Sequence, residues 1–204
     1  MITAQQALDK LIAGNKRFVA DECTGSQAIK SRRDELASGQ APFAIVLSCA
    51  DSRVPVEMIF DQGLGDLFVV RIAGNIAAPS QVGSIEFAVE QFDTPLIVVV
   101  GHSKCGAINA TINALQNPGG ECSPNLGVIV ERICPQVEPL LDTELQYQPE
   151  ELLDQSLRAN VRAAVDHLRH EPVLEKQVNA GNLMVIGAHY VLETGKVEFF
   201  SKSS

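Results

Sequence analysis

Short apolar runs of strand length recur along the chain, and they alternate with segments whose apolar residues follow helical spacing. The runs predict strands over residues 43–47, 67–72, 95–102, 183–187 and 197–200. The helical spacing predicts helices over residues 3–20, 31–37, 56–60, 83–92, 105–115, 126–134 and 149–168, of which the sixth is expected to end near Pro135. This alternation predicts an α/β fold with a mainly parallel central sheet and helices on both of its faces.

The two ends of the chain complete the predicted architecture. Thr3 and Gln6 have the spacing of a capping box, which marks the start of the first helix. The turn at 193–196 indicates that the last strand closes an antiparallel hairpin, and therefore that the sheet has an antiparallel edge strand. We expect a single domain over residues 1–204, made of an N-terminal helical arm (1–38), a core that carries the chemical motifs (40–115), and C-terminal helices and closing strands (116–204).

Composition and charge narrow the class of protein. A chain of 204 residues without a long polar tract is large enough to bury a substantial core. The net charge of -9 disfavours a nucleic-acid partner, because affinity for nucleic acid depends on Lys and Arg that neutralise phosphates. The apolar runs are too short to span a membrane, and the N-terminus lacks the basic start and apolar stretch of a secretory signal. We therefore expect a cytoplasmic protein with no membrane partner.

Reactive side chains follow two of the predicted strands. The run 43–47 leads into Ser-Cys-Ala-Asp-Ser-Arg at 48–53, and the run 96–100 leads into Gly-His-Ser-Lys-Cys-Gly at 101–106. Parallel sheets place their sites beyond the carboxyl ends of the strands, so these two segments are expected to meet there. Five cysteines at irregular spacing favour metal binding or catalysis over disulfides in a reducing compartment.

The residue types at the two strand ends predict a zinc site. Cys49, His102 and Cys105 supply two thiolates and one imidazole, a set that suits tetrahedral zinc. Three protein ligands leave the fourth position for water or for Asp51, and an open position indicates catalysis, since a structural site would need a fourth Cys or His. Arg53, two residues after Asp51, can pair with its carboxylate and keep it off the metal. When that pairing breaks, Asp51 is expected to ligate the zinc in a closed state.

These motifs carry a resemblance to a known family. The segments 48–53 and 101–106, together with Phe-Asp-Gln-Gly-Leu-Gly-Asp-Leu-Phe-Val-Val-Arg-Ile-Ala-Gly-Asn at 60–75, resemble the signatures of the beta-class carbonic anhydrases over roughly residues 40–115. The resemblance implies a zinc lyase that hydrates carbon dioxide reversibly to bicarbonate and a proton, through a zinc-bound hydroxide. It also implies that the N-terminal helices embrace a second subunit, in a homodimer or a dimer of dimers.

The resemblance assigns roles to single residues. It gives Cys49, His102 and Cys105 as the zinc ligands, and Asp51 with Arg53 as the dyad that orients the hydroxide.

For the substrate pocket, the resemblance implies a further set of residues. Gln40 matches a glutamine that hydrogen-bonds the bound substrate, Phe68 and Phe87 match the apolar wall, and the backbone amide of Gly106 matches a group that helps to hold the Asp51 carboxylate.

Other readings stay open at this point. A related zinc hydrolase of carbonyl sulfide or carbon disulfide would use the same scaffold, and a non-catalytic zinc or redox-thiol interaction protein would share the same ligands. Cys23, Cys122 and Cys134 are expected to be small buried core residues, with a redox pair of Cys122 and Cys134 as the alternative.

Overall fold

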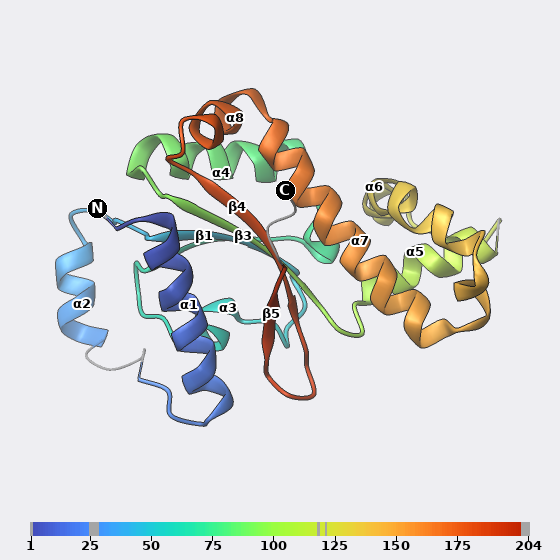
Figure 1. Ribbon diagram of the computed structural model, residues 1–204, viewed down its shortest axis with the longest axis horizontal. Coiled ribbons are helices and arrows are strands. Elements are labelled where there is room, and N and C mark those ends of the chain that lie inside the picture. The colour runs from blue at the N-terminus through green and yellow to red at the C-terminus, as the bar shows by residue number, and fades with distance from the viewer. Residues whose placement is uncertain (1, 25–28, 118, 121, 201–204) are drawn as a thin grey trace.

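The computed structural model describes residues 2–24, 29–117, 119–120 and 122–200, and five strands within them form one sheet (Figure 1). The strand order is β2-β1-β3-β4-β5. The first four strands are mutually parallel, and β5 runs antiparallel to β4 at the edge. The predicted fold class is thereby confirmed. The strands are β1 (Ala44–Ser48), β2 (Leu67–Arg71), β3 (Leu96–His102), β4 (Met184–Tyr190) and β5 (Val197–Phe199).

Helices cover both faces of the sheet. Helices α1 and α3 pack on one face, whereas α4, α7 and α8 lie over the other, and α5 and α6 pack together beside α7 (Figure 1). The helices are α1 (Ala4–Val19), α2 (Ile29–Leu36), α3 (Val56–Ile59), α4 (Pro79–Phe92), α5 (Gly106–Gln116), α6 (Pro124–Leu141), α7 (Pro149–His170) and α8 (Pro172–Asn179), with short 3-10 turns η1 (Ala73–Asn75) and η2 (Glu144–Tyr147). No helix in the described part of the chain is long and apolar enough to cross a membrane.

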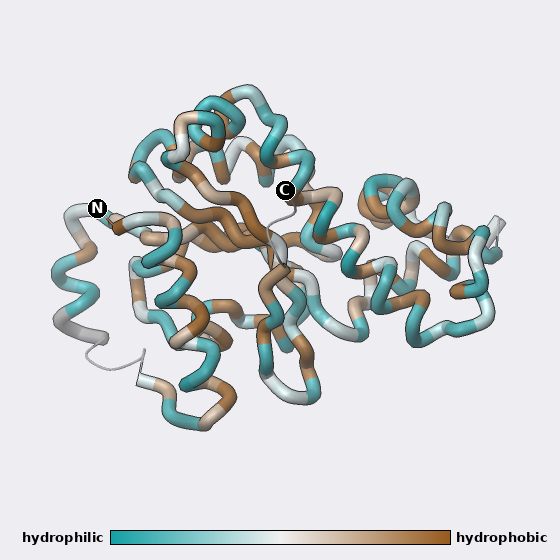
Figure 2. Tube along the Cα trace, in the orientation of Figure 1, coloured by the Kyte–Doolittle hydropathy of each residue, from teal (hydrophilic) through white to brown (hydrophobic). Residues whose placement is uncertain are grey.

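The core lies on the two faces of the central strands. Every residue of β1 and β3 is buried, and the sheet is the most apolar part of the trace in Figure 2. Because successive side chains of a strand point to opposite faces, Ile45 and Leu47 pack toward α4 and α7, whereas Ala44 and Val46 pack toward α1 and α3. Burial on both faces explains why these strands are continuous apolar runs in the sequence.

Helix α1 is attached to the sheet by two adjacent residues. The Asn15 side chain donates to the carbonyl oxygens of Ile59 and Gly195, and its own oxygen accepts the N–H of Val197. Gly14 lies so close to the Phe60 backbone that a Cβ would come within 1.7 Å of its carbonyl oxygen. The helix itself begins with the capping box of Thr3 and Gln6 that the sequence predicts.

The prediction that the sixth helix ends near Pro135 is wrong. Helix α6 continues to Leu141 and contains both Pro135 and Pro139. An interior proline removes one backbone hydrogen bond and crowds the preceding turn. Ile133 and Val137, on either side of Pro135, are fully buried, and this packing offsets that cost.

Other boundaries differ less. Helix α4 begins at Pro79 and not at residue 83, because proline is favoured in the first helical turn. Strand β4 extends past Gly187 to Tyr190, since its last three residues still pair with β3. Helix α8 was not predicted, and its first residue is again a proline.

Candidate metal centre

Three reactive side chains meet where two neighbouring strands end. Cys49 directly follows β1, His102 is the last residue of β3, and Cys105 precedes the first residue of α5. Strands β1 and β3 are paired in parallel, with Ser48 opposite Val100, so their carboxyl ends lie side by side. All three side chains are buried, with exposed fractions of 4% or less. Residues 53 positions apart in the sequence thus share one pocket, as the sequence predicts.

The geometry of these three residues fits zinc. One donor atom from each of Cys49, His102 and Cys105 can be chosen so that all lie within 4.8 Å of one another. The Nδ1 atom of His102 lies 2.9 Å from the Ser103 carbonyl oxygen, which leaves Nε2 buried and without a hydrogen-bond partner in the described part of the chain. A buried nitrogen without a partner needs an explanation, and a bound metal ion supplies one. Two thiolates and an imidazole are donors that zinc prefers.

The two thiols differ in acidity. A hydrogen bond from the Cys105 thiol lowers the pKa of Cys49, while the same contact and burial raise the pKa of Cys105. The backbone N–H of Gly74 also donates to Cys49 Sγ, at 3.4 Å. Cys49 is therefore the more acidic of the two thiols, and a metal held by both sulfurs would require Cys105 to release its proton.

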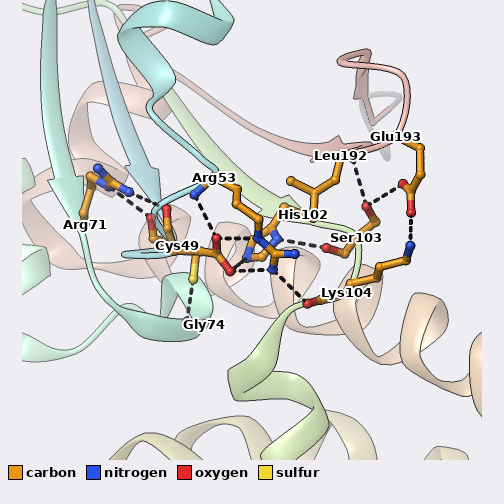
Figure 3. A network of polar contacts seen from close by, with 10 residues as sticks. Cys49, Arg53, Arg71, Gly74, His102, Ser103, Lys104, Leu192 and Glu193 are labelled. Atoms are coloured by element: carbon orange, nitrogen blue, oxygen red, sulfur yellow. Dashed lines mark hydrogen bonds and ion pairs between the residues drawn. The ribbon is translucent and has the colours of Figure 1, made fainter.

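Asp51 and Arg53 form an ion pair beside the cluster, and Figure 3 shows the Arg53 side chain close to His102. The guanidinium donates from Nε to Oδ1 at 2.9 Å and from Nη2 to Oδ2 at 2.8 Å, and the backbone N–H of Arg53 also donates to Oδ1. These bonds hold the pKa of Asp51 well below its ordinary value. Oδ2 lies 3.8 Å from Nε2 of His102, so the carboxylate borders the cluster while it stays paired with Arg53.

The backbone around this pair is anchored by three further hydrogen bonds. The Arg71 guanidinium donates to the carbonyl oxygens of Cys49 and Asp51, at 3.1 and 2.6 Å. Arg53 Nη2 donates to the carbonyl oxygen of Lys104, whose backbone is left-handed with φ 56°. Arg71 is the last residue of β2, and its place at a strand end and in the family-like segment 60–75 are the sequence signals that point to its role.

The loop after His102 is tied to the hairpin of β4 and β5 (Figure 3). Ser103 Oγ donates to Glu193 and accepts the N–H of Leu192, while Lys104 Nζ lies 2.5 Å from the same Glu193 carboxylate. The contact with Lys104 lowers the pKa of Glu193 to about 2. The loop that carries His102 and Cys105 is thus held from outside the centre.

The residues predicted for the substrate pocket lie apart from the cluster in this chain, except Gly106, which begins α5 directly after Cys105. Gln40 is exposed between α2 and β1. Phe68 pairs with Ile45, four residues before Cys49, and a rise of about 3.3 Å per residue puts it roughly 13 Å back along the sheet. Phe87 of α4 is 52% exposed and lies against Phe68.

The remaining cysteines do not belong to the core. Cys23 and Cys122 are exposed and Cys134 is partly buried, so the expectation of three buried core thiols is wrong. Cys23 lies in the loop after α1 and Cys122 in the loop before α6, whereas Cys134 lies within α6, between Ile133 and Pro135. All five cysteines are free.

The likeness to known proteins extends over most of the chain. The family model described as carbonic anhydrase matches residues 44–197. The chain is 40% identical over 190 residues to a carbonic anhydrase of Mycolicibacterium smegmatis, and the aligned region covers 92% of this chain and 89% of that protein. It is 39% identical over 187 residues to carbonic anhydrase 2 of Mycobacterium tuberculosis, with 90% and 86% covered.

Among solved structures, the β-carbonic anhydrase CafA of Aspergillus fumigatus superposes with a TM-score of 0.77 at 26% identity, covering 97% of this chain and 92% of that one. The buried cluster of Cys49, His102 and Cys105 is typical of the zinc ligands of this family. The chain belongs to the beta-class carbonic anhydrases and is a zinc-dependent carbonate dehydratase.

Proposed function

We propose that Asp51 and Arg53 orient the water that attacks carbon dioxide in the reversible formation of bicarbonate and a proton. The observation that carries this proposal is that Arg53 binds both carboxylate oxygens of Asp51, which keeps Oδ2 3.8 Å from Nε2 of His102. A carboxylate in that place borders the space that an attacking water would occupy.

Each side chain has a separate task in this scheme. When bound by Cys49, His102 and Cys105, zinc supplies a Lewis acid that makes water nucleophilic near neutral pH. Ionised Asp51 can only accept hydrogen bonds, so it turns the proton of the water toward itself and leaves a lone pair for the carbon atom. Because the pKa of Asp51 is held well below its ordinary value by Arg53, this carboxylate is a poor carrier for the released proton. We therefore assign Asp51 to orientation and not to proton removal.

The same pair controls access to the metal. If the hydrogen bonds from Arg53 to Asp51 break, the carboxylate is free to rotate toward the ligand cluster and take the fourth position itself. Such a closed state excludes water and has no activity. The contact of Arg53 with the Lys104 carbonyl oxygen supports the open arrangement.

We further propose that a second copy of the chain completes the substrate pocket. Carbon dioxide is apolar, so an aromatic wall of Phe68 and Phe87 would suit it, with Gln40 as the polar contact and the Gly106 amide beside Asp51. Phe87 is half-exposed, and β2 forms the edge of the sheet with β1 as its neighbour in the described chain. These features support a homodimer, or a dimer of dimers, in which the N-terminal arm reaches the partner.

The five free thiols support a reducing compartment, and we propose the cytoplasm.

The decisive experiment measures zinc content and carbon dioxide hydration on the same preparations. The wild type and the Asp51→Ala and Asp51→Asn variants are compared at pH 7 and pH 9. We expect about one zinc per chain in all three, hydration that rises with pH in the wild type, and a loss of about 100-fold in both variants.

Two outcomes would overturn the proposal. Full activity of Asp51→Asn would show that the carboxylate orients nothing. Zinc binding without hydration at either pH would redirect the assay to carbonyl sulfide and carbon disulfide, and inactivity on these as well would leave a zinc-binding protein without turnover.

A further inference from the structure

The hydrogen bond to the Cys49 sulfur comes from an unusual piece of backbone. Gly74, in the turn η1 that follows β2, donates its N–H to Sγ at 3.4 Å. Its backbone is left-handed, with φ 69° and ψ 16°, and the next residue, Asn75, also has a positive φ of 45°. Two consecutive left-handed residues are uncommon, and glycine has wide conformational freedom, so the turn needs an external restraint.

That restraint comes from a residue 86 positions further along the chain. Asn160 of α7 donates from Nδ2 to the Gly74 carbonyl oxygen at 2.8 Å. The Asn160 side chain is buried, with 4% of the residue exposed, and it borders a cavity whose lining mixes apolar residues such as Ile76 with polar ones such as Gln136. A buried amide is costly unless it is hydrogen-bonded, and the bond to Gly74 satisfies its donor.

Packing leaves no alternative to this arrangement. A Cβ at position 74 would lie 2.7 Å from Cδ1 of Ile133 in α6 and 3.1 Å from the Cβ of Ala107 in α5. The turn is therefore enclosed by helices on one side and by the Cys49 sulfur on the other. Because Asn160 holds the carbonyl and the Cα is enclosed, the backbone of Gly74 has little room to rotate its N–H away from Sγ.

We propose that Asn160 is a positioning residue of the metal centre, which acts through Gly74 to keep an N–H group on the Cys49 sulfur. A hydrogen bond to a metal-bound thiolate withdraws charge from the sulfur. It thereby counteracts the two thiolates, which otherwise weaken zinc as a Lewis acid, and it fixes the orientation of the ligand. This inference rests on the zinc site of the proposed function and extends it to a residue on a distant helix.

The test uses the cobalt(II)-substituted protein, because the absorption band for sulfur-to-cobalt charge transfer reports on the charge of the sulfur. Asn160→Leu keeps the branching and the number of side-chain heavy atoms, although its methyl groups are larger, and it lacks a donor and excludes water from the gap. Asn160→Ala is a second variant that introduces no larger side chain. Ser156→Ala is the matched control, since Ser156 is fully buried one turn earlier on α7 and its Oγ has no partner among the described residues.

We expect the charge-transfer band of Asn160→Leu to move to longer wavelength, and its metal to pass to a chelator about 10-fold faster than in the wild type. The Ser156→Ala band should stay in place. If circular dichroism shows that Asn160→Leu does not fold, the position of the charge-transfer band in Asn160→Ala is the test, and we expect the same shift to longer wavelength.

Unchanged bands in folded Asn160 variants would overturn the inference while leaving the zinc site intact. Absence of a charge-transfer band in the wild type would instead contradict the assignment of the two thiolates as metal ligands. Both the proposed function and this extension of it would then be wrong.

Discussion

Arg53 binds Asp51 with three N–H groups, two from its guanidinium and one from its own backbone amide. The two residues are two positions apart, so the pairing closes a small local ring and needs no help from the rest of the fold to form. The tertiary structure sets the orientation of this pair, because Arg71 of β2 donates to the carbonyl oxygens of Cys49 and Asp51. The carboxylate is thereby aimed at the metal ligands.

The planar shape of the Arg53 guanidinium should be essential to the orientation of the Asp51 carboxylate. In Arg53→Lys, a single ammonium cannot bind both carboxylate oxygens, so Asp51 gains freedom to rotate. We expect carbon dioxide hydration to fall by up to about 100-fold with zinc content unchanged. Arg132→Lys, at an exposed arginine of α6, is the control and should behave as the wild type. Wild-type activity in Arg53→Lys would show that a single positive charge is sufficient.

Removing a ligand should separate metal binding from folding. In Cys105→Ser the hydroxyl is a poor zinc ligand, so zinc binding should weaken by more than the roughly 10- to 100-fold that loss of an outer-shell partner costs. The main apolar clusters lie on the two faces of the sheet, so the far-ultraviolet circular dichroism should be unchanged. Cys122→Ser, at an exposed thiol, should keep its zinc. Equal zinc content in the two variants would contradict the ligand assignment.

Two glycines in helices should respond oppositely to alanine. At Gly14 the new Cβ would lie 1.7 Å from the Phe60 carbonyl oxygen, which is backbone and cannot move aside. We expect Gly14→Ala to lower the free energy of unfolding by about 1–3 kcal/mol. At Gly83, in α4, no atom lies within 4 Å of the new Cβ, and the helical conformation favours alanine. Gly83→Ala should raise the free energy of unfolding by about 0.5–1 kcal/mol. Urea unfolding measures both, and a shift of the same sign in the two would refute the packing argument.

His189 should make stability depend on pH. It is buried, and its Nδ1 lies 3.0 Å from Arg158 Nη2. Burial and then the Arg158 charge lower the pKa of His189, although Asp154 and Glu198 oppose this. The unfolded chain therefore binds the proton first, and the free energy of unfolding should fall as pH drops below the ordinary histidine pKa of about 6.5.

The measurement for His189 is urea unfolding at pH 7 and pH 5. His189→Gln should lose less stability across this interval than the wild type does in the same metal state. His170→Gln is the control, because the His170 side chain is 66% exposed and should leave the wild-type dependence unchanged. An equal loss in His189→Gln and the wild type would rule out His189 as the source.

Much of the fold and of the metal centre could be predicted from local patterns. The apolar runs before Cys49 and His102 locate β1 and β3, because strands buried on both faces must be apolar throughout. Reactive residues that directly follow neighbouring parallel strands lie together beyond the carboxyl ends of those strands. Residue type then predicts zinc, since two thiols and an imidazole suit that metal better than oxygen-seeking cations.

Other features depend on contacts that no local pattern encodes. Helix α6 passes through Pro135 because Ile133 and Val137 are buried against other helices, and that packing outweighs a local penalty. The exposure of Cys23 and Cys122 likewise depends on what surrounds each thiol.

The residues that support the ligands belong to the same group. Arg71, Gly74 and Asn160 reach the site from three different elements, and although Arg71 and Gly74 lie in the family-like segment 60–75, no local pattern shows which atoms they contact. The sequence by itself determined which atoms can bind the metal, because residue type and position directly after an apolar run are local properties. The tertiary structure alone decided how those atoms are held, because hydrogen bonds between residues 86 positions apart exist only after the chain has folded.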